Sequence, residues 1–415
     1  VAGNMNDTVL MRYKYQIVNH RRNRKLHQFI DIGGIAWNHT VALQRRHYRL
    51  TGKRIGKYDM GAHLLKVRRQ NPKRDYWKLL NSQAYKEIAD RHDKALTRFL
   101  TGLAKGRPKF RKVKKFRSIV LPMGNGCKLL ESDNPRIGRM QFAYGWRGAE
   151  KMNLRYHIGD RPLEGKVKSV TIKRTGDGKF WLSFVVERER PRIFYPSTGK
   201  TGGFDFGLRI FLTTDEGQAI ASPGFLFEEL DELKRRSKKL SGRGRKKLGS
   251  GSWKREKFAV SRLHIKIVNR RIDFHWKLAH ELCQRYDVLC FEDLGLDEMK
   301  RQLPHKKARR KHGDLALGEF RRKLEWVAQK TGREIRYINR YKPSSKTCSV
   351  CGHEVDEMPV EQRTFECVAC GLLIDRDHNA ARNIFQWGRG PVLGESGVRL
   401  TANAGATALT TEPTA

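Results

Sequence analysis

The sequence has few acidic residues for its size. Among its 415 residues, 43 are Asp or Glu and 86 are Lys or Arg, which gives a formal net charge of +43. Such an excess of positive charge would repel itself unless a polyanion neutralised it. Nucleic acid is the polyanion that we expect, with an anionic membrane surface as the alternative, and binding to nucleic acid should weaken steeply with salt.

Long apolar runs are also missing. No stretch of about 18 apolar residues occurs, so the sequence predicts no membrane span. The first residues lack a basic segment followed by an apolar run, so we expect no signal peptide. Met5 and Met11 are both candidates for the natural start. Together these features predict a cytoplasmic protein.

Cysteine is scarce, with seven residues in the chain. An odd number, with four in paired CxxC spacing, argues for a reducing compartment and a metal site rather than disulfides. The four are Cys348, Cys351, Cys367 and Cys370. Their spacing is typical of a structural zinc site with four thiolate ligands, in which a glycine follows each turn. His353 and His378 lie nearby as surplus residues, and Cys127, Cys283 and Cys290 are expected to be buried small hydrophobes.

Residue periodicity predicts both helices and strands in the first half of the chain. Residues 8–18 alternate like a strand, and residues 22–49 and about 81–103 are periodic like helices, with Asn81 or Ser82 as the second cap. Strand signals dominate from about 118 to 190, and we expect a small antiparallel barrel that the 8–18 strand completes. The apolar face of the 22–49 helix is expected to consist of Leu26, Ile30, Trp37, Val41 and Tyr48. The core face of the barrel is expected to include Phe142, Tyr144 and Trp146, for which stacking on bases is the alternative.

Strands and helices alternate from residue 200 onward, which predicts an α/β domain. The expected elements are a hairpin at 202–220, a long helix at 253–286, a buried parallel strand at 288–291, a helix at 314–331, a strand at 334–338 and a helix at 378–387. The last residues, 388–415, lack periodicity, and we expect a disordered tail. Basic residues crowd three segments, 105–117, 234–247 and 300–311, which are either nucleic-acid contacts or solvated faces.

Three carboxylates stand in short motifs of this second half. Asp205 lies between Gly203 and Gly207 on an alternating strand, and we expect these glycines to leave room for a metal and a phosphate. Glu292 ends the apolar strand, at the sheet edge where α/β proteins bind ligands. Asp377 precedes a helix and could merely cap it. Carboxylates gathered at one point need cations, and two Mg²⁺ ions could hydrolyse a phosphodiester there.

The third carboxylate has a competitor, because Asp375 lies two residues before Asp377. We favour Asp377, which directly precedes the start of the helix. The motifs Gly203–Leu208, Phe291–Leu296, the cysteine quartet and Asp375–Ile384, in this order, resemble those of TnpB proteins. These are transposon-encoded RNA-guided nucleases related to compact type V CRISPR effectors.

The resemblance implies a multidomain α+β fold: an N-terminal wedge β-barrel interrupted by a helical recognition domain, then a RuvC-like nuclease domain of RNase H type with a zinc-ribbon insertion. The expected boundaries are 1–19 for the first wedge strand, 20–104 for the recognition domain, 105–196 for the barrel, 197–346 and 373–387 for the nuclease, 347–372 for the ribbon and 388–415 for the tail.

The resemblance also implies an activity, cutting of double-stranded DNA next to a short adjacent motif. The catalytic, magnesium-binding residues would be Asp205, Glu292 and Asp377, with two Mg²⁺ ions, and the cysteine quartet would hold one Zn²⁺. The partners would be a guide RNA from the transposon end and target double-stranded DNA, with no membrane. The protein would be prokaryotic and associated with the nucleoid when bound to DNA.

Three other functions compete with this one. An RNA-guided DNA-binding protein without cleavage, acting like a repressor, would be expected to lack a triad carboxylate, whereas all three positions are acidic here. A DDE-type transposase carries its acids in the order Asp, Asp, Glu, whereas this chain has Asp, Glu, Asp. A structural RNA-binding protein with a zinc ribbon would need no carboxylate cluster.

Overall fold

The computed structural model of the chain divides into two compact units, Val1–Arg190 and Pro191–Ala415. The residues that it describes are 8–18, 24–70, 72–144, 150–159, 161–189, 194–241, 247–303, 305–359, 362–390 and 398–400. None of the helices in these ranges is long and apolar enough to cross a membrane.

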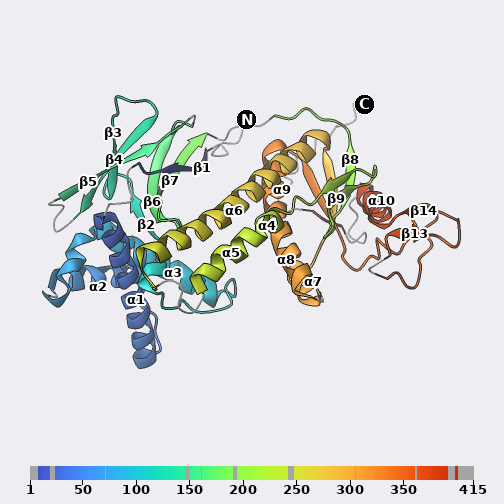
Figure 1. Ribbon diagram of the computed structural model, residues 1–415. Coiled ribbons are helices and arrows are strands. Elements are labelled where there is room, and N and C mark those ends of the chain that lie inside the picture. Colours follow the sequence, from blue (N-terminus) through green and yellow to red (C-terminus); the bar gives the residue numbers. More distant parts are fainter. Residues whose placement is uncertain are drawn as a thin grey trace. The chain divides into compact units, whose positions relative to one another are not determined.

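The first unit combines helices with short antiparallel strands (Figure 1). Its elements are β1 (Thr8–Gln16), α1 (Arg24–Thr51), α2 (Lys57–Gln70), η1 (Pro72–Leu79), α3 (Ser82–Leu100), η2 (Val113–Lys115), β2 (Ser118–Pro122), β3 (Cys127–Leu130), β4 (Ile137–Tyr144), β5 (Glu150–His157), β6 (Lys166–Arg174) and β7 (Phe180–Glu189).

The strands of this unit form two sheets, in the orders β1-β7-β6-β2 and β3-β4-β5. All neighbours are antiparallel, and the N-terminal strand pairs along its whole length with β7, from Thr8 opposite Glu189. One isolated bridge, Ile17 to Tyr156, links the two sheets. The predicted antiparallel pairing, including that of the N-terminal strand, is therefore confirmed. The described strands form two sheets joined by this bridge rather than one closed barrel.

The two predicted helices are present, and Asn81 caps the second, because its side chain accepts a hydrogen bond from the Gln83 amide at 2.7 Å. Most of the predicted face of α1 is buried, but Tyr48 is 49% exposed, so its placement in the core was wrong. Phe142 and Tyr144 are buried as core residues, and Trp146 lies outside the described residues. The helices α2 and η1 were not predicted.

The basic segment 105–117 docks on α1. Asn38 exchanges two hydrogen bonds with the backbone of Arg111, both at 2.8 Å, and the Trp37 indole donates to the Lys109 carbonyl at 3.1 Å. Backbone groups thus anchor this segment while most of its charged side chains stay exposed. The exposed side chains leave both interpretations of this segment, a nucleic-acid contact and a solvated face, open.

The second unit is an α/β unit built on one mixed sheet. Its elements are β8 (Thr201–Asp205), β9 (Ile210–Thr214), β10 (Ala219–Ala221), α4 (Phe225–Glu228), α5 (Leu230–Ser241), α6 (Gly251–Arg285), β11 (Val288–Glu292), α7 (Leu296–Gln302), α8 (Lys306–Leu315), α9 (Leu317–Thr331), β12 (Glu334–Ile338), β13 (Thr364–Glu366), β14 (Leu373–Asp375), α10 (Arg376–Arg389) and β15 (Val398–Leu400). The strand order is β10-β9-β8-β11-β12-β15, in which β8, β11 and β12 are parallel.

The apolar strand β11 is buried on both faces, as its sequence predicts. Leu289 and Phe291 join the cluster with α6 and α9, whereas Cys290 packs with Ile338 and with Ile384 of α10. Alternate side chains of a strand point to opposite faces, so α10 covers one side of this strand and α6 and α9 cover the other. A strand covered on both sides needs an uninterrupted apolar run.

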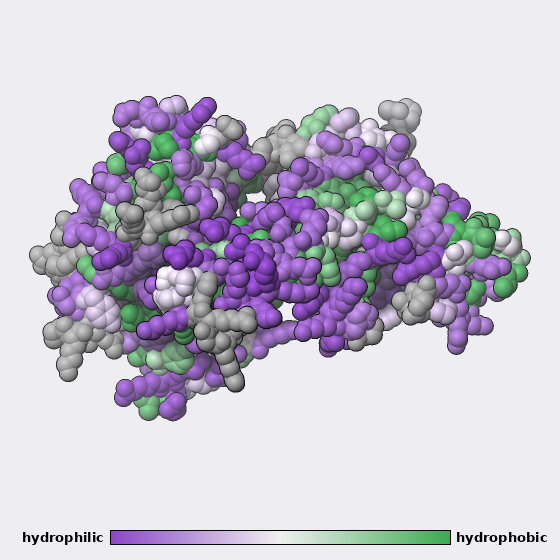
Figure 2. All heavy atoms as spheres, in the orientation of Figure 1, coloured by the Kyte–Doolittle hydropathy of each residue, from purple (hydrophilic) through white to green (hydrophobic). Residues whose placement is uncertain are grey.

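Two expectations for this unit need correction. The helix expected at 314–331 is α9, which begins three residues later, at Leu317. Asp314 and Leu315 end a separate helix, α8, which was not predicted, and the two helices meet at Ala316 in a left-handed conformation (φ 49°). The expected disordered tail contributes β15, which pairs with β12, and the rest of it after Gly390 lies outside the described residues. The two other basic runs lie mainly on helices, and Figure 2 shows hydrophilic residues over most of the visible face.

Candidate metal-binding sites

Two of the three predicted carboxylates end neighbouring parallel strands. Phe204 of β8 lies opposite Phe291 of β11, so the next residues, Asp205 and Glu292, leave the sheet side by side. Both carboxylates are half-buried. They follow Gly203 and Cys290 by two residues and therefore share the face of the sheet that α10 covers.

The third carboxylate comes from the first turn of α10. Asp375 is the N-cap, because its Oδ1 accepts hydrogen bonds from the backbone amides of Asp377 (2.9 Å) and His378 (3.0 Å). Asp377 lies inside the helix and carries no capping role, so the interpretation of Asp377 as the cap is wrong. The His378 ring lies 3.0 Å from the Asp215 carbonyl and supports this turn against the β9–β10 connection.

The charges of the other two carboxylates act on Asp205. Burial, then the charges of Asp377 and Glu292, raise the pKa of Asp205 to about 8. Burial also raises the pKa of Glu292 to about 6 and raises that of Asp377. A site in which every carboxylate resists ionisation gains most from a bound cation, because the cation removes both the repulsion and the cost of burial.

The carboxylate oxygens are spread rather than gathered at one point. Within the described residues, the only group of three or more candidate ligand atoms that lie within 4.8 Å of one another is the cysteine quartet. A single ion would need a tighter carboxylate cluster, whereas two ions about 3.5–4 Å apart spread their ligands over a wider site.

The expected role of Gly203 needs correction. A Cβ at this position would lie 2.4 Å from the Ala381 carbonyl and 2.5 Å from the Phe385 amide, so the missing side chain admits the backbone of α10 rather than a metal. A Cβ at Gly207 would lie 3.7 Å from Oδ2 of Asp377, so this glycine does border the carboxylates. The first glycine thus sets how closely Asp377 approaches the sheet.

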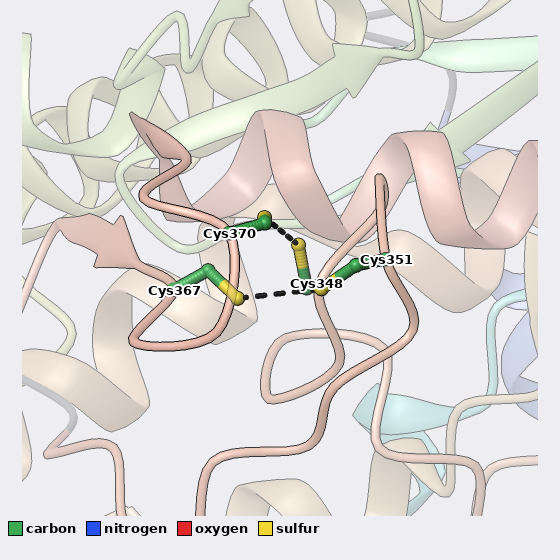
Figure 3. Close-up of side chains that lie close together, drawn as sticks. All are labelled: Cys348, Cys351, Cys367 and Cys370. Atoms are coloured by element: carbon green, nitrogen blue, oxygen red, sulfur yellow. Dashed lines mark hydrogen bonds between the residues drawn. The ribbon is translucent and has the colours of Figure 1, made fainter.

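The cysteine quartet forms the second site (Figure 3). The Sγ atoms of Cys348 and Cys370 lie 3.6 Å apart, and those of Cys351 and Cys367 lie 3.5 Å apart. Four thiolates around one Zn²⁺, with Zn–S distances of about 2.3 Å, would be separated by about 3.8 Å, so the quartet fits a zinc site.

The two halves of the quartet share one turn geometry. In the first, the amide of Gly352 donates to the Cys348 carbonyl at 3.0 Å, and in the second that of Gly371 donates to the Cys367 carbonyl at 2.8 Å. Both glycines have positive φ, 77° and 74°, as the sequence predicted for these positions. Cys127, Cys283 and Cys290 are buried away from this cluster, as expected.

A row of amide side chains on α10, residues Asn379, Asn383 and Gln386, joins the two sites. We call it the amide row. Its members donate to backbone carbonyls of the segment that carries the first two cysteines: Asn379 to Thr347 (2.7 Å), Asn383 to Ser344 (2.7 Å) and Thr347 (2.6 Å), and Gln386 to Ser349 (2.8 Å). Asn379 also accepts from the Ser349 amide at 3.0 Å.

The amide row was missed in the sequence, although spacing at i, i+4 and i+7 places its members on one helical face. Asn379 and Asn383 are almost completely buried, at 0% and 1% exposure. The helix that supplies Asp377 therefore also holds the first cysteine turn. In addition, the Ser344 hydroxyl lies 3.5 Å from Glu292, so this segment borders the carboxylate site.

The sequence of this chain is similar to those of several known proteins. The family described as "Cas12f1-like, TNB domain" matches residues 318–384, and the family described as "Probable transposase" (OrfB_IS605) matches residues 183–303. A "Putative RNA-guided DNA endonuclease" of Streptomyces pristinaespiralis is 32% identical over 59% of this chain and 61% of its own length. A "TnpB-like protein L79" of Acanthamoeba polyphaga mimivirus is 29% identical over 56% of this chain and 45% of its own length.

The chain is similar in sequence to proteins of the TnpB family. It spans about half to three fifths of the length of the two relatives above. It spans 92% of a third, "Putative RNA-guided DNA endonuclease InsQ" of Escherichia coli, at 25% identity. The fold is similar to that in a cryo-EM structure titled "Cas12f1-sgRNA-target DNA complex", with a TM-score of 0.56 over 91% of this chain and 99% of the other, at 14% identity.

Proposed function

We propose that the chain is an RNA-guided DNA endonuclease whose cutting site is formed by Asp205, Glu292 and Asp377. One observation carries the proposal: two carboxylates end adjacent parallel strands, and a helix that crosses the same face adds the third. The similarity to TnpB proteins and the net charge of +43 support nucleic acid as the substrate. We assign the second unit to a RuvC-like domain because its sheet has a three-stranded meander extended by parallel strands.

The three carboxylates would hold two Mg²⁺ ions. When bound, such ions generate a nucleophilic hydroxide and stabilise the leaving oxygen of a phosphodiester. The chain itself holds the carboxylates on rigid elements and keeps them partly out of water. Burial and the charge of Asp375 raise the pKa of Asp377. Three arginines oppose this rise, and they therefore lie close enough to attract the phosphates of an incoming strand: Arg363, Arg376 and Arg209.

The cysteine quartet would hold one structural Zn²⁺. Its four thiolates would close the coordination shell and leave no open position for chemistry. The contribution of this chain is the amide row, which fastens the first cysteine turn to α10. We therefore propose that residues 347–372 form a zinc ribbon whose order supports the position of Asp377.

Guidance would come from an RNA of the transposon end, and the target would be double-stranded DNA beside a short adjacent motif. Base pairing then reads the sequence, while the protein binds backbone charge and the adjacent motif. We assign residues 1–19 and 105–196 to a wedge domain and 20–104 to a recognition domain, since β1 pairs with β7 across the intervening helices.

The test compares single carboxylate variants in a cleavage assay with Mg²⁺, co-purified RNA and a DNA library. Asp205→Ala and Asp377→Asn should abolish cutting and leave RNA binding intact. Asp375→Asn is the matched control, because Asn caps a helix as well as Asp does, and it should still cut. Cutting by Asp205→Ala would refute the site.

The competing function, RNA-guided binding without cleavage, predicts a different result. The wild-type chain would then bind RNA-matched DNA and leave it uncut with Mg²⁺. If the purified protein carries no discrete RNA, both hypotheses, RNA-guided cleavage and RNA-guided binding, are refuted.

A further inference from the structure

A cavity of about 630 Å³ lies in the first unit, whereas both candidate metal sites belong to the second. One face of α1 and the C-terminal half of α3 line it, together with Arg54 and the start of the basic segment at Arg107. Ligand-binding pockets for small molecules are typically about 300–1,000 Å³. The cavity is therefore large enough for one small organic group.

The lining combines apolar walls with a cationic rim. Tyr48 and Leu100, at 49% and 59% exposure, expose apolar surface there, although water penalises it. The rim carries four arginines, Arg45, Arg49, Arg54 and Arg107, and no acidic residue lines the cavity among the described residues.

Two of these arginines are already used to build the cavity. Arg45 donates to the Pro108 carbonyl at 3.2 Å and stacks on Phe110 at 4.8 Å, and Arg107 lies 5.7 Å from the Tyr48 ring. These contacts hold the basic segment over the helices. Arg49 and Arg54 are exposed and have no ion-pair partner among the described residues, so their charge is available to a ligand.

We propose that this cavity binds one unstacked nucleotide of a single-stranded nucleic acid, with its base against Tyr48 and Leu100 and its phosphate on Arg49 and Arg54. A nucleotide combines a flat, partly apolar ring with an anionic group, which are the two features that the lining complements. The buried His92, at 4% exposure, also lines the cavity.

The proposal rests on nucleic acid being the partner, and its test uses binding rather than cleavage. The probes are oligouridylate and oligothymidylate of about 12 nucleotides, each with one photoreactive 4-thio base, a length within the usual range for single-strand sites. The full chain, freed of co-purified RNA, is titrated with each probe at several salt concentrations. Crosslinked residues are then mapped by mass spectrometry.

Arg49→Ala/Arg54→Ala should weaken binding of the preferred probe about tenfold and lower the salt slope by about 1.4, because each phosphate contact on a single strand contributes about 0.7. Arg139→Ala/Arg155→Ala, which removes two exposed arginines from facing positions on β4 and β5, is the control with equal charge change and should have a smaller effect. Crosslinks should map to Tyr48 or to neighbouring residues of α1 and α3.

Equal effects of the two double variants, or crosslinks only outside α1 and α3, would overturn the proposal while leaving the endonuclease proposal intact. Failure of the wild-type chain to bind either probe would count against nucleic acid as the partner, and so against both. The tighter probe identifies whether RNA or DNA supplies the nucleotide.

Discussion

Replacing Asn383 with Ala tests whether the amide row holds the first cysteine turn in place. The side chain is buried, and its amide nitrogen donates to two carbonyls, those of Ser344 and Thr347. The Thr347 carbonyl keeps a second donor, Asn379, after the replacement. Among the described residues, no other group donates to the Ser344 carbonyl, so the replacement would leave it without a partner beside the carboxylate site.

The magnitude follows from these contacts. Two lost hydrogen bonds cost about 1 kcal/mol each, and a carbonyl left without a partner adds about 1–3 kcal/mol. The Asn383 Oδ1 atom has no hydrogen-bond partner, so its removal returns roughly 1 kcal/mol. We expect a net loss of about 2–4 kcal/mol, which in a unit of this size lowers the melting temperature by roughly 4–16 °C.

The assay is thermal unfolding of the zinc-loaded chain, followed together with release of zinc to a chromogenic dye. Gln386→Ala is the matched control, because Gln386 makes the same kind of bond to Ser349 from an exposed position, and it should cost under about 1 kcal/mol. We expect the Asn383 variant to release zinc at lower temperature than the control. Equal melting and equal release would show that the amide row does not hold the cysteine turn.

Three further predictions follow from the site and the fold. The pKa of Asp205 is raised to about 8 from an ordinary 3.8, so between pH 3.8 and pH 8 the folded chain holds a proton that the unfolded chain has lost, and stability falls as pH rises through this range. Asp205→Asn should reduce this fall, and without magnesium it should melt at a higher temperature than wild type at pH 8. Gly203→Ala should lower stability by about 1–3 kcal/mol and impair cutting by forcing α10 from β8, whereas Gly251→Ala, with nothing within 4 Å, should do neither in the same melting and cleavage assays. Ala316→Gly should raise the melting temperature by about 2–4 °C, since it relieves roughly 1 kcal/mol of left-handed strain, and an unchanged or lower value would contradict this.

Sequence periodicity predicted the long elements well because burial repeats along them. The helix α6 and the strand β11 have clear periods or an uninterrupted apolar run, and both were placed within a few residues. The region of α2 and η1 carries few apolar residues, among them Met60, Leu64 and Trp77, so its helices gave little signal. The break lies on an alanine, Ala316, and the nearby Gly313 and Gly318 did not fix its position.

The candidate sites, like the fold, were predicted from the sequence only in part. The cysteine spacing predicted a cluster that the structure forms, since four ligands to one ion must lie at fixed intervals. The roles of Asp375, Gly203 and Asn383 depend on which elements meet in space, so neither the cap nor the close helix approach nor the buried amide could be derived from spacing. Tyr48 matched a core period, but it lies at the wall of a cavity rather than in the core.

The pairing of β1 with β7 has a consequence for synthesis. The first strand leaves the ribosome early, yet its partner residues begin at Trp181 and end at Glu189. At about 5–20 residues per second, β1 waits on the order of 10–35 s with its ladder of amides and carbonyls unpaired. Folding of the first unit must therefore finish late, and pauses in translation after the β7 codons would give the sheet time to close before the second unit emerges.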